Sequence, residues 1–490
     1  MKLIPSLICD FYKISHRNQY PTGTESVYST WVPRSNKHLP YITEATVFGI
    51  QGFINELHDL FDREFFSKSL VNVISEYTDT IKKSLSVDSP DTSHVESLHA
   101  LGYLPIEIKS LDEGSSVPMR TPIMTVENTL PEFYWLTNYL ETAISANLWK
   151  PSTTASIARH YRTIFEHYAE QTCDDNAMVP FQGHDFSMRG MSGVEDAARS
   201  GAGHLLSFWG TDTIPAIHYL EKHYQPEKDI LIGCSVPATE HSVMCAGGQD
   251  DELETYRRLI EDIYPTGIIS IVSDTWDFWH VVTDTLPKLK DKIMQRDGKV
   301  VIRPDSGDPY LIIVGDKNAP VGSPENKGLI ECLFETFGGR VNTKGYTELD
   351  AHIGAIYGDS ITTKLADRIC DGLMRKGFAS NNVVFGIGSF TYQYLTRDSL
   401  GYAMKATSVV INGERKAIFK NPKTDDGTKK SNKGRVKVFK NEIDGKYYVT
   451  DESTGRMLFD DSPCDMKVRY VDGKKLNQQT LGEIRENIRK

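Results

Sequence analysis

The sequence predicts an α/β fold: an irregular TIM-like α/β barrel, with a second α+β domain built from the two ends of the chain. In the middle of the chain, seven apolar, strand-like segments each end in polar or glycine residues, and a helix-like segment usually follows. Alternating strands and helices are typical of a parallel sheet with right-handed crossovers. Seven such units exceed the usual open sheet and favour a barrel. An open, doubly wound sheet is the alternative.

The predicted strands and helices can be placed in order along this part of the chain. The strands end at Phe186, 208–212, 233–235, Ser273-Asp274, 302–305, 357–359 and 385–388. Three of the intervening segments have apolar residues at the spacing of a helix face, over 253–263, 329–337 and 365–373. Ser323-Pro324 is expected to open the second helix, and glycines to close the second and third.

The two ends of the chain have a different pattern. Residues 106–109 and 123–126 alternate apolar and polar side chains, as half-buried strands do. Residues 436–439 and 447–449 are also predicted to be antiparallel strands. We therefore expect a barrel domain between two flanking segments that fold together, with the limits 1–150, 151–404 and 405–490.

The composition excludes several classes of protein. With 39% hydrophobic and 25% charged residues, the chain has the composition of a globular protein and disorder is not indicated. The net charge of −11 argues against nucleic-acid binding, and no apolar run approaches the length that spans a membrane. Seven cysteines without a Cys-x-x-Cys pair, and a start that is acidic too soon for a secretory signal, predict a cytoplasmic protein without structural zinc.

The most informative segment is the loop that follows the apolar run 300–302. It presents Arg303 and Asp305 within a bend rich in glycine and proline. A guanidinium beside carboxylates can hold a phosphate together with a ribose or Mg²⁺, and loops at strand carboxyl ends are where α/β proteins bind ligands. A charged turn with a local ion pair is the alternative interpretation.

Two other strand ends carry groups that suit a flat heteroaromatic ligand. Phe186 and Arg189 can enclose such a ring between an aromatic face and a cation, although Phe186 alone is more often a core residue. Asp212 can accept an N–H from a ligand. Its alternative role is to cap the helix that is expected to begin near Ile214.

His241 is the candidate for acid–base or nucleophilic chemistry. It follows a predicted strand end, and neighbouring strand ends supply Asp274 and Asp305, either of which can orient the imidazole. A structural histidine is the alternative.

Several glycine-containing and basic segments suit phosphate groups. Gly358-Asp359 and the segment with Gly388 and Ser389 can form backbone cradles, although turns use glycine constantly. Arg397 and Lys405 can complete a phosphate site. The basic segment 420–435 can capture a phosphorylated ligand, or it can be a solvated loop.

Taken together, these segments closely resemble the nicotinamide phosphoribosyltransferase family over nearly the whole chain. The segments that carry the resemblance, in chain order, are 10–13, 104–109, 134–138, 184–190, 210–213, 235–242, 302–307, 358–359 and 395–398. The resemblance implies a barrel of the type II phosphoribosyltransferases. It implies that nicotinamide and 5-phosphoribosyl 1-pyrophosphate are joined to give nicotinamide mononucleotide and pyrophosphate in NAD salvage. It also implies Mg²⁺, ATP coupling through a phosphorylated His241, and a homodimer with shared active sites.

The resemblance assigns further roles to residues of this sequence. Phe186 would stack on the pyridine ring, with Tyr12 of the partner subunit on its other face, while Arg189 and Asp212 would address the carboxamide. Ser235 is expected in the same substrate-binding set. Residues implied to hold ribose, pyrophosphate and phosphates are Arg303, Asp305, Gly358, Asp359, Gly388, Ser389, Arg397 and Lys405, with Arg34, Lys420 and Lys429 of the partner subunit.

The chemistry of Asp212 and of the Arg303 loop agrees with these roles. A carboxylate accepts an N–H from an amide but repels the carboxylate of nicotinic acid, at a cost of several kcal/mol when buried. Arg303 suits the departing pyrophosphate and Asp305 the cationic ribose. A nicotinate-using enzyme and a catalytically silent nucleotide-binding homologue are the alternatives. Asp212 argues against the first, and the set of His241, Asp274, Arg303 and Asp305 against the second.

Overall fold

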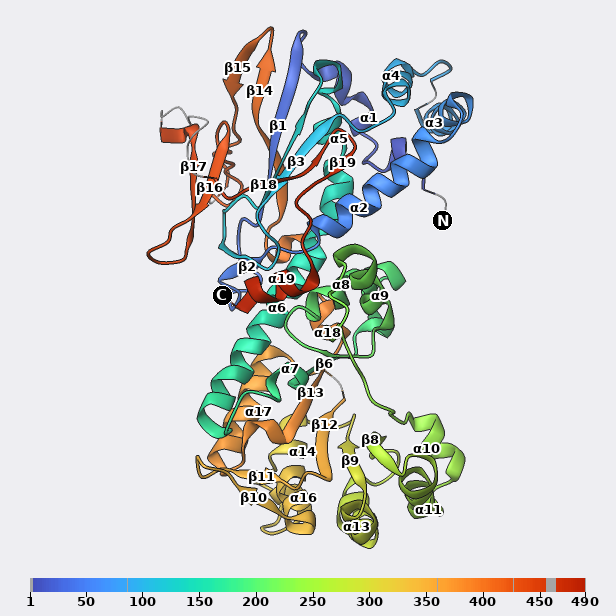
Figure 1. Cartoon of the computed structure of the whole chain (residues 1–490), viewed down its shortest axis with the longest axis vertical. Coiled ribbons are helices and arrows are strands. Elements are labelled where there is room, and N and C mark those ends of the chain that lie inside the picture. Colours follow the sequence, from blue (N-terminus) through green and yellow to red (C-terminus); the bar gives the residue numbers. More distant parts are fainter. Residues whose placement is uncertain (1–2, 86, 359, 426, 455–463, 490) are drawn as a thin grey trace. The chain divides into compact units, whose positions relative to one another are not determined.

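The computed structural model describes residues 3–85, 87–358, 360–425, 427–454 and 464–489 (Figure 1). The chain divides into two compact units. The first unit comprises Met1–Ser156, Tyr219–Ile230 and Leu395–Lys490, and the second comprises Ile157–His218 and Leu231–Tyr394. Residues 219–230 belong to the first unit, although the domain expected over 151–404 includes them.

The second unit is built on a six-stranded sheet in the order β7-β6-β13-β12-β9-β8. Its strands are β6 (Gly183–Asp185), β7 (Gly210–Thr211), β8 (Thr266–Val272), β9 (Asp297–Arg303), β12 (Ile353–Tyr357) and β13 (Val383–Ile387). Every neighbouring pair in this sheet is parallel. Because all six strands have the same direction, their carboxyl ends meet at one edge of the sheet. Six of the seven predicted strand ends are thereby confirmed.

The seventh predicted strand end lies in a segment that connects the two edges of this sheet. Cys234 forms a parallel bridge with Gly210 of β7, and Ala238 forms one with Ser270 of β8. Backbone hydrogen bonds of 2.7 to 3.0 Å accompany both bridges. The segment 234–238 therefore closes the sheet into an irregular ring, as predicted, rather than leaving it open.

Helices follow most strands of the ring, and α7 precedes its first strand, β6. They are α7 (Val179–Gln182), α8 (Val194–His204), α10 (His241–Gly247), α11 (Glu252–Arg257), α12 (Phe278–His280), α13 (Leu286–Met294), α14 (Pro309–Ile313), α15 (Pro324–Lys327), α16 (Leu329–Phe337), α17 (Thr363–Arg375) and α18 (Ser389–Tyr392). A hairpin of β10 (Gly339–Val341) and β11 (Thr347–Leu349) lies between α16 and β12. The three predicted helical stripes are confirmed in α11 with the π-helical turn Arg258–Ile263, in α16 and in α17.

One predicted helix start is wrong. Ser323 and Pro324 open the short helix α15 and not α16, since the Ser323 hydroxyl accepts the backbone N–H of Asn326. Gly328 then adopts a left-handed φ of 80°. This conformation ends α15, and α16 begins at the next residue.

The first unit is built on a seven-stranded sheet to which both ends of the chain contribute (Figure 1). In the order β15-β14-β1-β5-β3-β18-β19, its strands are Glu414–Ala417, Ala403–Ile411, Thr24–Val32, Met124–Asn128, Ile106–Ser110, Lys467–Val471 and Lys474–Lys475. All its pairs are antiparallel. The expected strands over 106–109 and 123–126 are confirmed in this sheet, and those over 436–439 and 447–449 form a separate antiparallel pair.

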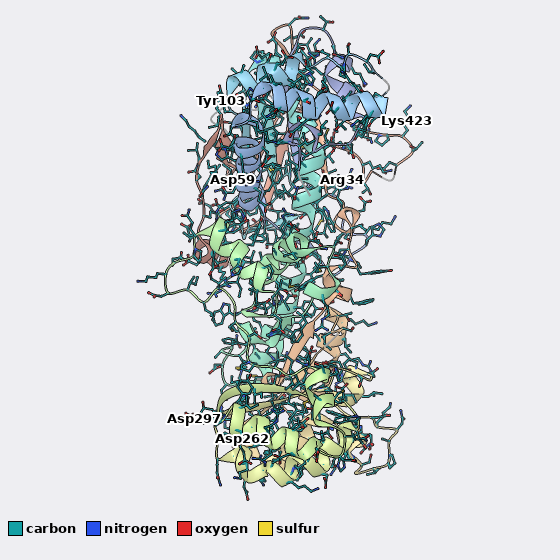
Figure 2. The ribbon with its side chains drawn as sticks, turned by 90° about the vertical axis from the view of Figure 1, so that its right-hand side faces the viewer. Arg34, Asp59, Tyr103, Asp262, Asp297 and Lys423 are labelled. Atoms are coloured by element: carbon teal, nitrogen blue, oxygen red, sulfur yellow. The ribbon has the colours of Figure 1, made fainter. Side chains whose placement is uncertain are left out.

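Smaller elements complete the first unit. They are the pairs β2 (Glu44–Thr46) with β4 (Ser116–Pro118) and β16 (Val436–Lys440) with β17 (Tyr447–Asp451), and the helices α1 (Lys13–His16), α2 (Ile50–Phe61), α3 (Leu70–Leu85), α4 (Ser93–Leu101), α5 (Leu136–Tyr139) and α19 (Leu481–Arg489). Helices α6 (Glu141–Thr172) and α9 (Ile214–Tyr224) contain residues of both units. Lys423 of the basic segment is exposed on a loop (Figure 2). Within the described ranges, no helix has the length and apolarity to cross a bilayer.

Burial in the ring determines which apolar side chains stabilise it. Ile302 on β9 is fully buried, whereas Val321 is 96% exposed in a loop of the same unit. We expect Ile302→Ala to lower the free energy of unfolding by about 2 to 5 kcal/mol, because it leaves a cavity. Val321→Ala should leave it unchanged. Guanidinium denaturation of the two variants checks this, and equal unfolding midpoints would contradict the assigned burial.

Candidate active site

The ring of the second unit encloses a cavity of about 300 Å³ with mostly apolar walls, here called the lumen cavity. Among the side chains that line it are Phe186, Asp212, Ser235 and Arg303, which come from four different members of the ring. The structure therefore brings these predicted site residues together. Their convergence follows from the closed ring, because each stands at the carboxyl end of its strand or in the closing segment.

Asp212 is the best-defined polar group of the lumen cavity. Its Oδ1 lies 2.9 Å from Nε2 of His184 and accepts a 2.6 Å hydrogen bond from the Ser235 hydroxyl. Burial raises the pKa of this carboxyl, but these two partners and the charge of Arg303 outweigh it, so the pKa lies below its usual range. Among the described residues none hydrogen-bonds to Oδ2, which leaves that oxygen for a ligand N–H. The carboxylate is thus an acceptor rather than the cap of α9.

His184 is a site residue that the sequence alone did not single out. It stands two residues before Phe186 and therefore on the same face of the strand. The centroids of the two rings are 4.5 Å apart, with a tilt of 37°. The sequence signal for His184 was its position two residues before Phe186, which is the spacing of side chains on one face of a strand. His184 thus orients Asp212 and packs beside the aromatic platform that Phe186 offers to the cavity.

Arg189 lies apart from the lumen cavity. It is exposed on the turn Met188–Gly190 and does not line the cavity. The turn instead packs against Ser389, because a Cβ added at Gly190 would lie 2.1 Å from the Ser389 hydroxyl oxygen. Ser389 begins α18 and Gly388 precedes it. The structure therefore places Arg189 beside the expected phosphate-binding segment, and its role at the carboxamide stays a prediction.

A second group of predicted residues forms a connected chain of polar contacts. His241 Nε2 lies 3.2 Å from Oδ1 of Asp274, and the other oxygen of Asp274 accepts the backbone N–H of Asp305 at 3.1 Å. The Nε of Arg303 lies 3.5 Å from Oδ1 of Asp305. Because the Asp274 side chain is 5% exposed and that of His241 is 49% exposed, the carboxylate is a buried support for an accessible imidazole.

Position 358 requires glycine, because the Asp305 side chain approaches its backbone closely. A Cβ at this position would lie 1.7 Å from Oδ1 of Asp305. Its backbone N–H donates to the carbonyl of Pro304 at 3.1 Å. Gly358 therefore supports the Asp305 loop from the neighbouring strand. The predicted residue Asp359 lies outside the described residues.

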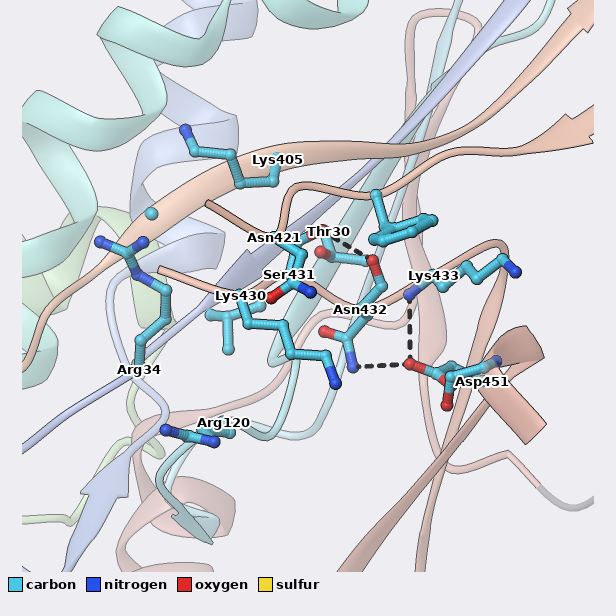
Figure 3. Close-up of a pocket in the computed structure, with 14 residues that line it drawn as sticks. Thr30, Arg34, Arg120, Lys405, Asn421, Lys430, Ser431, Asn432, Lys433 and Asp451 are labelled. Atoms are coloured by element: carbon cyan, nitrogen blue, oxygen red, sulfur yellow. Dashed lines mark hydrogen bonds between the residues drawn. The ribbon is translucent and has the colours of Figure 1, made fainter. Parts of the chain in front are cut away.

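The first unit contains a cavity of about 400 Å³ lined by several cations, here called the cation cavity (Figure 3). Arg34 donates from Nε to the carbonyl of Gly401 at 2.8 Å. Burial lowers the pKa of Arg34, and the charge of Arg397 lowers it further. Burial likewise lowers the pKa of Lys405. The charges of Arg34 and Lys420 lower this pKa further, whereas Glu141 raises it. Like charges held together in this way suit a polyanionic ligand.

The cation cavity also contains basic residues that were not predicted individually. These are Arg120, Lys430 and Lys433. The basic segment was the signal for the two lysines, whereas nothing in the sequence pointed to Arg120, which has a left-handed φ of 73°. Lys420 and Lys429 do not line the cavity, but each precedes a residue that does.

Tyr12 and Arg397 line another cavity of the first unit, of about 230 Å³. Glu141 belongs to the same wall. This carboxylate pairs with Lys13 at 2.6 Å and with Lys405 at 3.3 Å. Glu141 therefore connects the cavity lined by Tyr12 and Arg397 to Lys405 of the cation cavity.

In the described part of the chain, no group of three or more His, Cys, Asp or Glu side chains is placed so that it could hold a metal ion. Asp305 and Asp274 offer single carboxylates that other groups of the chain already contact. This donor set fits a Mg²⁺ ion that takes most of its ligands from phosphate oxygens and water.

Comparison with known proteins places this architecture in a family. The family described as "Nicotinate phosphoribosyltransferase (NAPRTase) family" matches residues 181–463. A nicotinamide phosphoribosyltransferase from Acinetobacter baylyi is 47% identical over 99% of this chain and 97% of its own length. A protein of the same name from Mycoplasma pneumoniae is 35% identical over 88% of this chain and 94% of its own.

Two solved structures share the fold. A nicotinate-nucleotide pyrophosphorylase from Pyrococcus furiosus has a TM-score of 0.58 and 14% identity, over 99% of this chain and 94% of its own. Human nicotinic acid phosphoribosyltransferase has a TM-score of 0.54 and 14% identity, over 99% and 93%. The family match, and the relatives that are 47% and 35% identical over most of this chain, support one conclusion. The chain belongs to the nicotinate phosphoribosyltransferase family.

Proposed function

We propose that this protein is a nicotinamide phosphoribosyltransferase, which condenses nicotinamide with 5-phosphoribosyl 1-pyrophosphate to nicotinamide mononucleotide and pyrophosphate. The observation that carries the proposal is Asp212 in the lumen cavity, with Oδ1 held by His184 and Ser235. Its other oxygen can accept the amide N–H of a pyridine ring stacked on Phe186. The names of the relatives from Acinetobacter baylyi and Mycoplasma pneumoniae support the same activity.

The alternative substrate is nicotinic acid, and the electrostatics of Asp212 disfavour it. Because the pKa of this carboxyl is lowered, it is ionised at neutral pH. A second carboxylate beside it would be repelled in a cavity with mostly apolar walls. The amide has no charge and supplies the N–H that Asp212 needs.

The Arg303 loop suits the bond exchange at the sugar. As the pyridine nitrogen attacks the sugar carbon, the bond to pyrophosphate breaks and positive charge develops on the ribose. Asp305 offers an anion for that charge, and Arg303 a cation for the departing pyrophosphate. The contact between them at 3.5 Å keeps both groups in place before the substrate binds. Mg²⁺, when bound to the pyrophosphate, would neutralise further negative charge.

ATP coupling through His241 is part of the proposal. An imidazole whose Nε2 contacts Asp274 is held in one orientation, so its free nitrogen can accept a phosphoryl group. The exposure of His241 leaves room for that group.

We also propose a cytoplasmic homodimer in which the sites are shared. The second unit supplies Phe186, Asp212 and Arg303, while the first unit carries Tyr12 and the cation cavity. A two-fold dimer would give each site the second unit of one protomer and the first unit of its partner. The seven free cysteines agree with a reducing compartment.

Replacing Asp212 tests the choice of substrate. Asp212→Ser removes the charge that repels nicotinate, so the ratio of kcat/KM for nicotinamide to that for nicotinate should fall about tenfold or more. Asp291→Ser, at an exposed aspartate of α13, is the control and should keep the ratio. Unchanged discrimination in Asp212→Ser would remove the electrostatic argument.

Replacing His241 tests the coupling to ATP. His241→Ala should lose the stimulation of nicotinamide mononucleotide formation by ATP, because the phosphoryl acceptor is gone. It should keep part of the basal transfer, because Phe186, Asp212 and Arg303 remain. His218→Ala, at an exposed histidine of α9, should behave as the wild type. Equal stimulation of the His241 variant and the wild type would defeat the assignment.

Mixed dimers test whether sites are shared. A Lys429→Ala chain paired with a Phe186→Ala chain would contain one intact site and one doubly altered site. Purified mixed dimers should therefore recover about half of the wild-type activity, while each parental homodimer stays inactive or weak. The absence of recovery would show that each chain builds its site alone.

A further inference from the structure

The inner end of the lumen cavity carries polar groups that the proposed reaction does not use. Lys299, Val301 and Arg303 follow one another along the same face of β9, so the lysine lies toward the amino ends of the strands. Ser270 of β8 pairs with Val301 and therefore lies between Lys299 and Arg303 along the strand direction. Asn381 lines the same cavity just before β13.

Two of these groups are buried without a protein partner. Ser270 is 4% exposed, and its hydroxyl has no hydrogen-bond partner among the described residues. The Oδ1 of Asn381 is also buried and unpartnered there, while its amide nitrogen donates to Glu348 at 3.3 Å. Because buried polar groups nearly always have partners, both point to an occupant of the cavity.

Lys299 gives the inner end its charge. Its stem packs over Gly354 of the neighbouring strand β12, where a Cβ would lie 3.2 Å from the lysine Cδ. Burial lowers the pKa of Lys299, and the charge of Asp350 offsets only part of this effect. Within the described chain, no carboxylate lies within ion-pair distance of this ammonium. A ligand anion would supply the missing partner.

We propose that the inner end of the lumen cavity binds a small monocarboxylate with an apolar body. Its carboxylate would contact the Lys299 ammonium and accept the Ser270 hydroxyl, and its body would pack against Ile268, Val301 and Ile356. The Asn381 Oδ1 adds an acceptor for a hydroxyl or N–H on the same molecule. A single cation in an apolar wall suits a singly charged carboxylate better than a phosphate ester, which requires more donors.

The two ends of the cavity would then select opposite ligands. Asp212 at the outer end repels a carboxylate, whereas Lys299 at the inner end attracts one. The remaining cation, Arg303, is engaged by Asp305 and by the Thr239 carbonyl at 2.6 Å. Because both ends share about 300 Å³, a molecule at Lys299 would hinder entry of the pyridine ring. This inhibition rests on the proposed function, whereas the binding site does not.

Isothermal titration calorimetry of the full chain with 4-hydroxyphenylacetate tests the site. The wild type should bind it, and should bind the uncharged 4-hydroxyphenylacetamide about tenfold more weakly or worse. Lys299→Met keeps an apolar stem but removes the charge, and should weaken binding of the acid about tenfold or more. Lys290→Met, at an exposed lysine of α13, removes the same charge outside the cavity and should change nothing.

A second variant keeps the test decisive if Lys299→Met alters folding. Ser270→Ala should weaken binding of the acid severalfold, because the hydroxyl no longer donates to the carboxylate. Equal binding of acid and amide, or equal affinity of the wild type and both cavity variants, would overturn the proposal. So would an absence of binding at millimolar acid, which would mean that water alone occupies the inner end.

Enzymatic competition distinguishes this site from the proposed reaction. If the acid binds and raises the apparent KM for nicotinamide, both proposals are supported. If the acid binds in a Lys299-dependent manner but no nicotinamide mononucleotide forms, the site stands and the proposed function fails.

Discussion

The closure of the parallel sheet is the constraint on which the second unit depends. Among the described residues, two single bridges, Cys234 with Gly210 and Ala238 with Ser270, turn six parallel strands into a ring. Because every strand has the same direction, closure brings the carboxyl end of each strand to one rim. Phe186, Asp212 and Arg303 then face a single cavity although they are far apart in sequence. An open sheet would leave the edge strands β7 and β8 far from each other.

Charge is arranged differently in the two units. In the second unit, single charges have close polar partners, as Asp212 has in His184 and Ser235 and as Asp305 has in Arg303. These pairs fix orientation. In the first unit, several cations share one cavity. Burial lowers the pKa of Lys405 there, and the charge of Arg34 lowers it further. That arrangement is unfavourable without an anion and therefore suits phosphate groups.

Much of the second unit could be predicted because its strands are apolar runs that end abruptly in polar residues. The same signal located Asp212, His241, Asp274 and Arg303. It could not show that the segment 234–238 contacts both edges, because isolated bridges have no period. It also missed Lys299, since a lysine just before the apolar run Val300-Val301-Ile302 resembles an exposed residue at the start of a strand.

Local backbone conformations account for the other differences. The separation of α15 from α16 depends on the left-handed Gly328. The Ser-Pro signal alone predicted that the helix over 329–337 opens at Ser323-Pro324. Arg120 reaches the cation cavity from a turn in which a non-glycine residue has a left-handed φ, which no sequence rule anticipates.

The most direct test of the central claim is a crystal structure of the protein with nicotinamide mononucleotide. The ring should then lie in the lumen cavity against Phe186, with its amide nitrogen within hydrogen-bond distance of Oδ2 of Asp212. A pyridine ring bound outside the cavity, or an amide directed away from Asp212, would contradict the account.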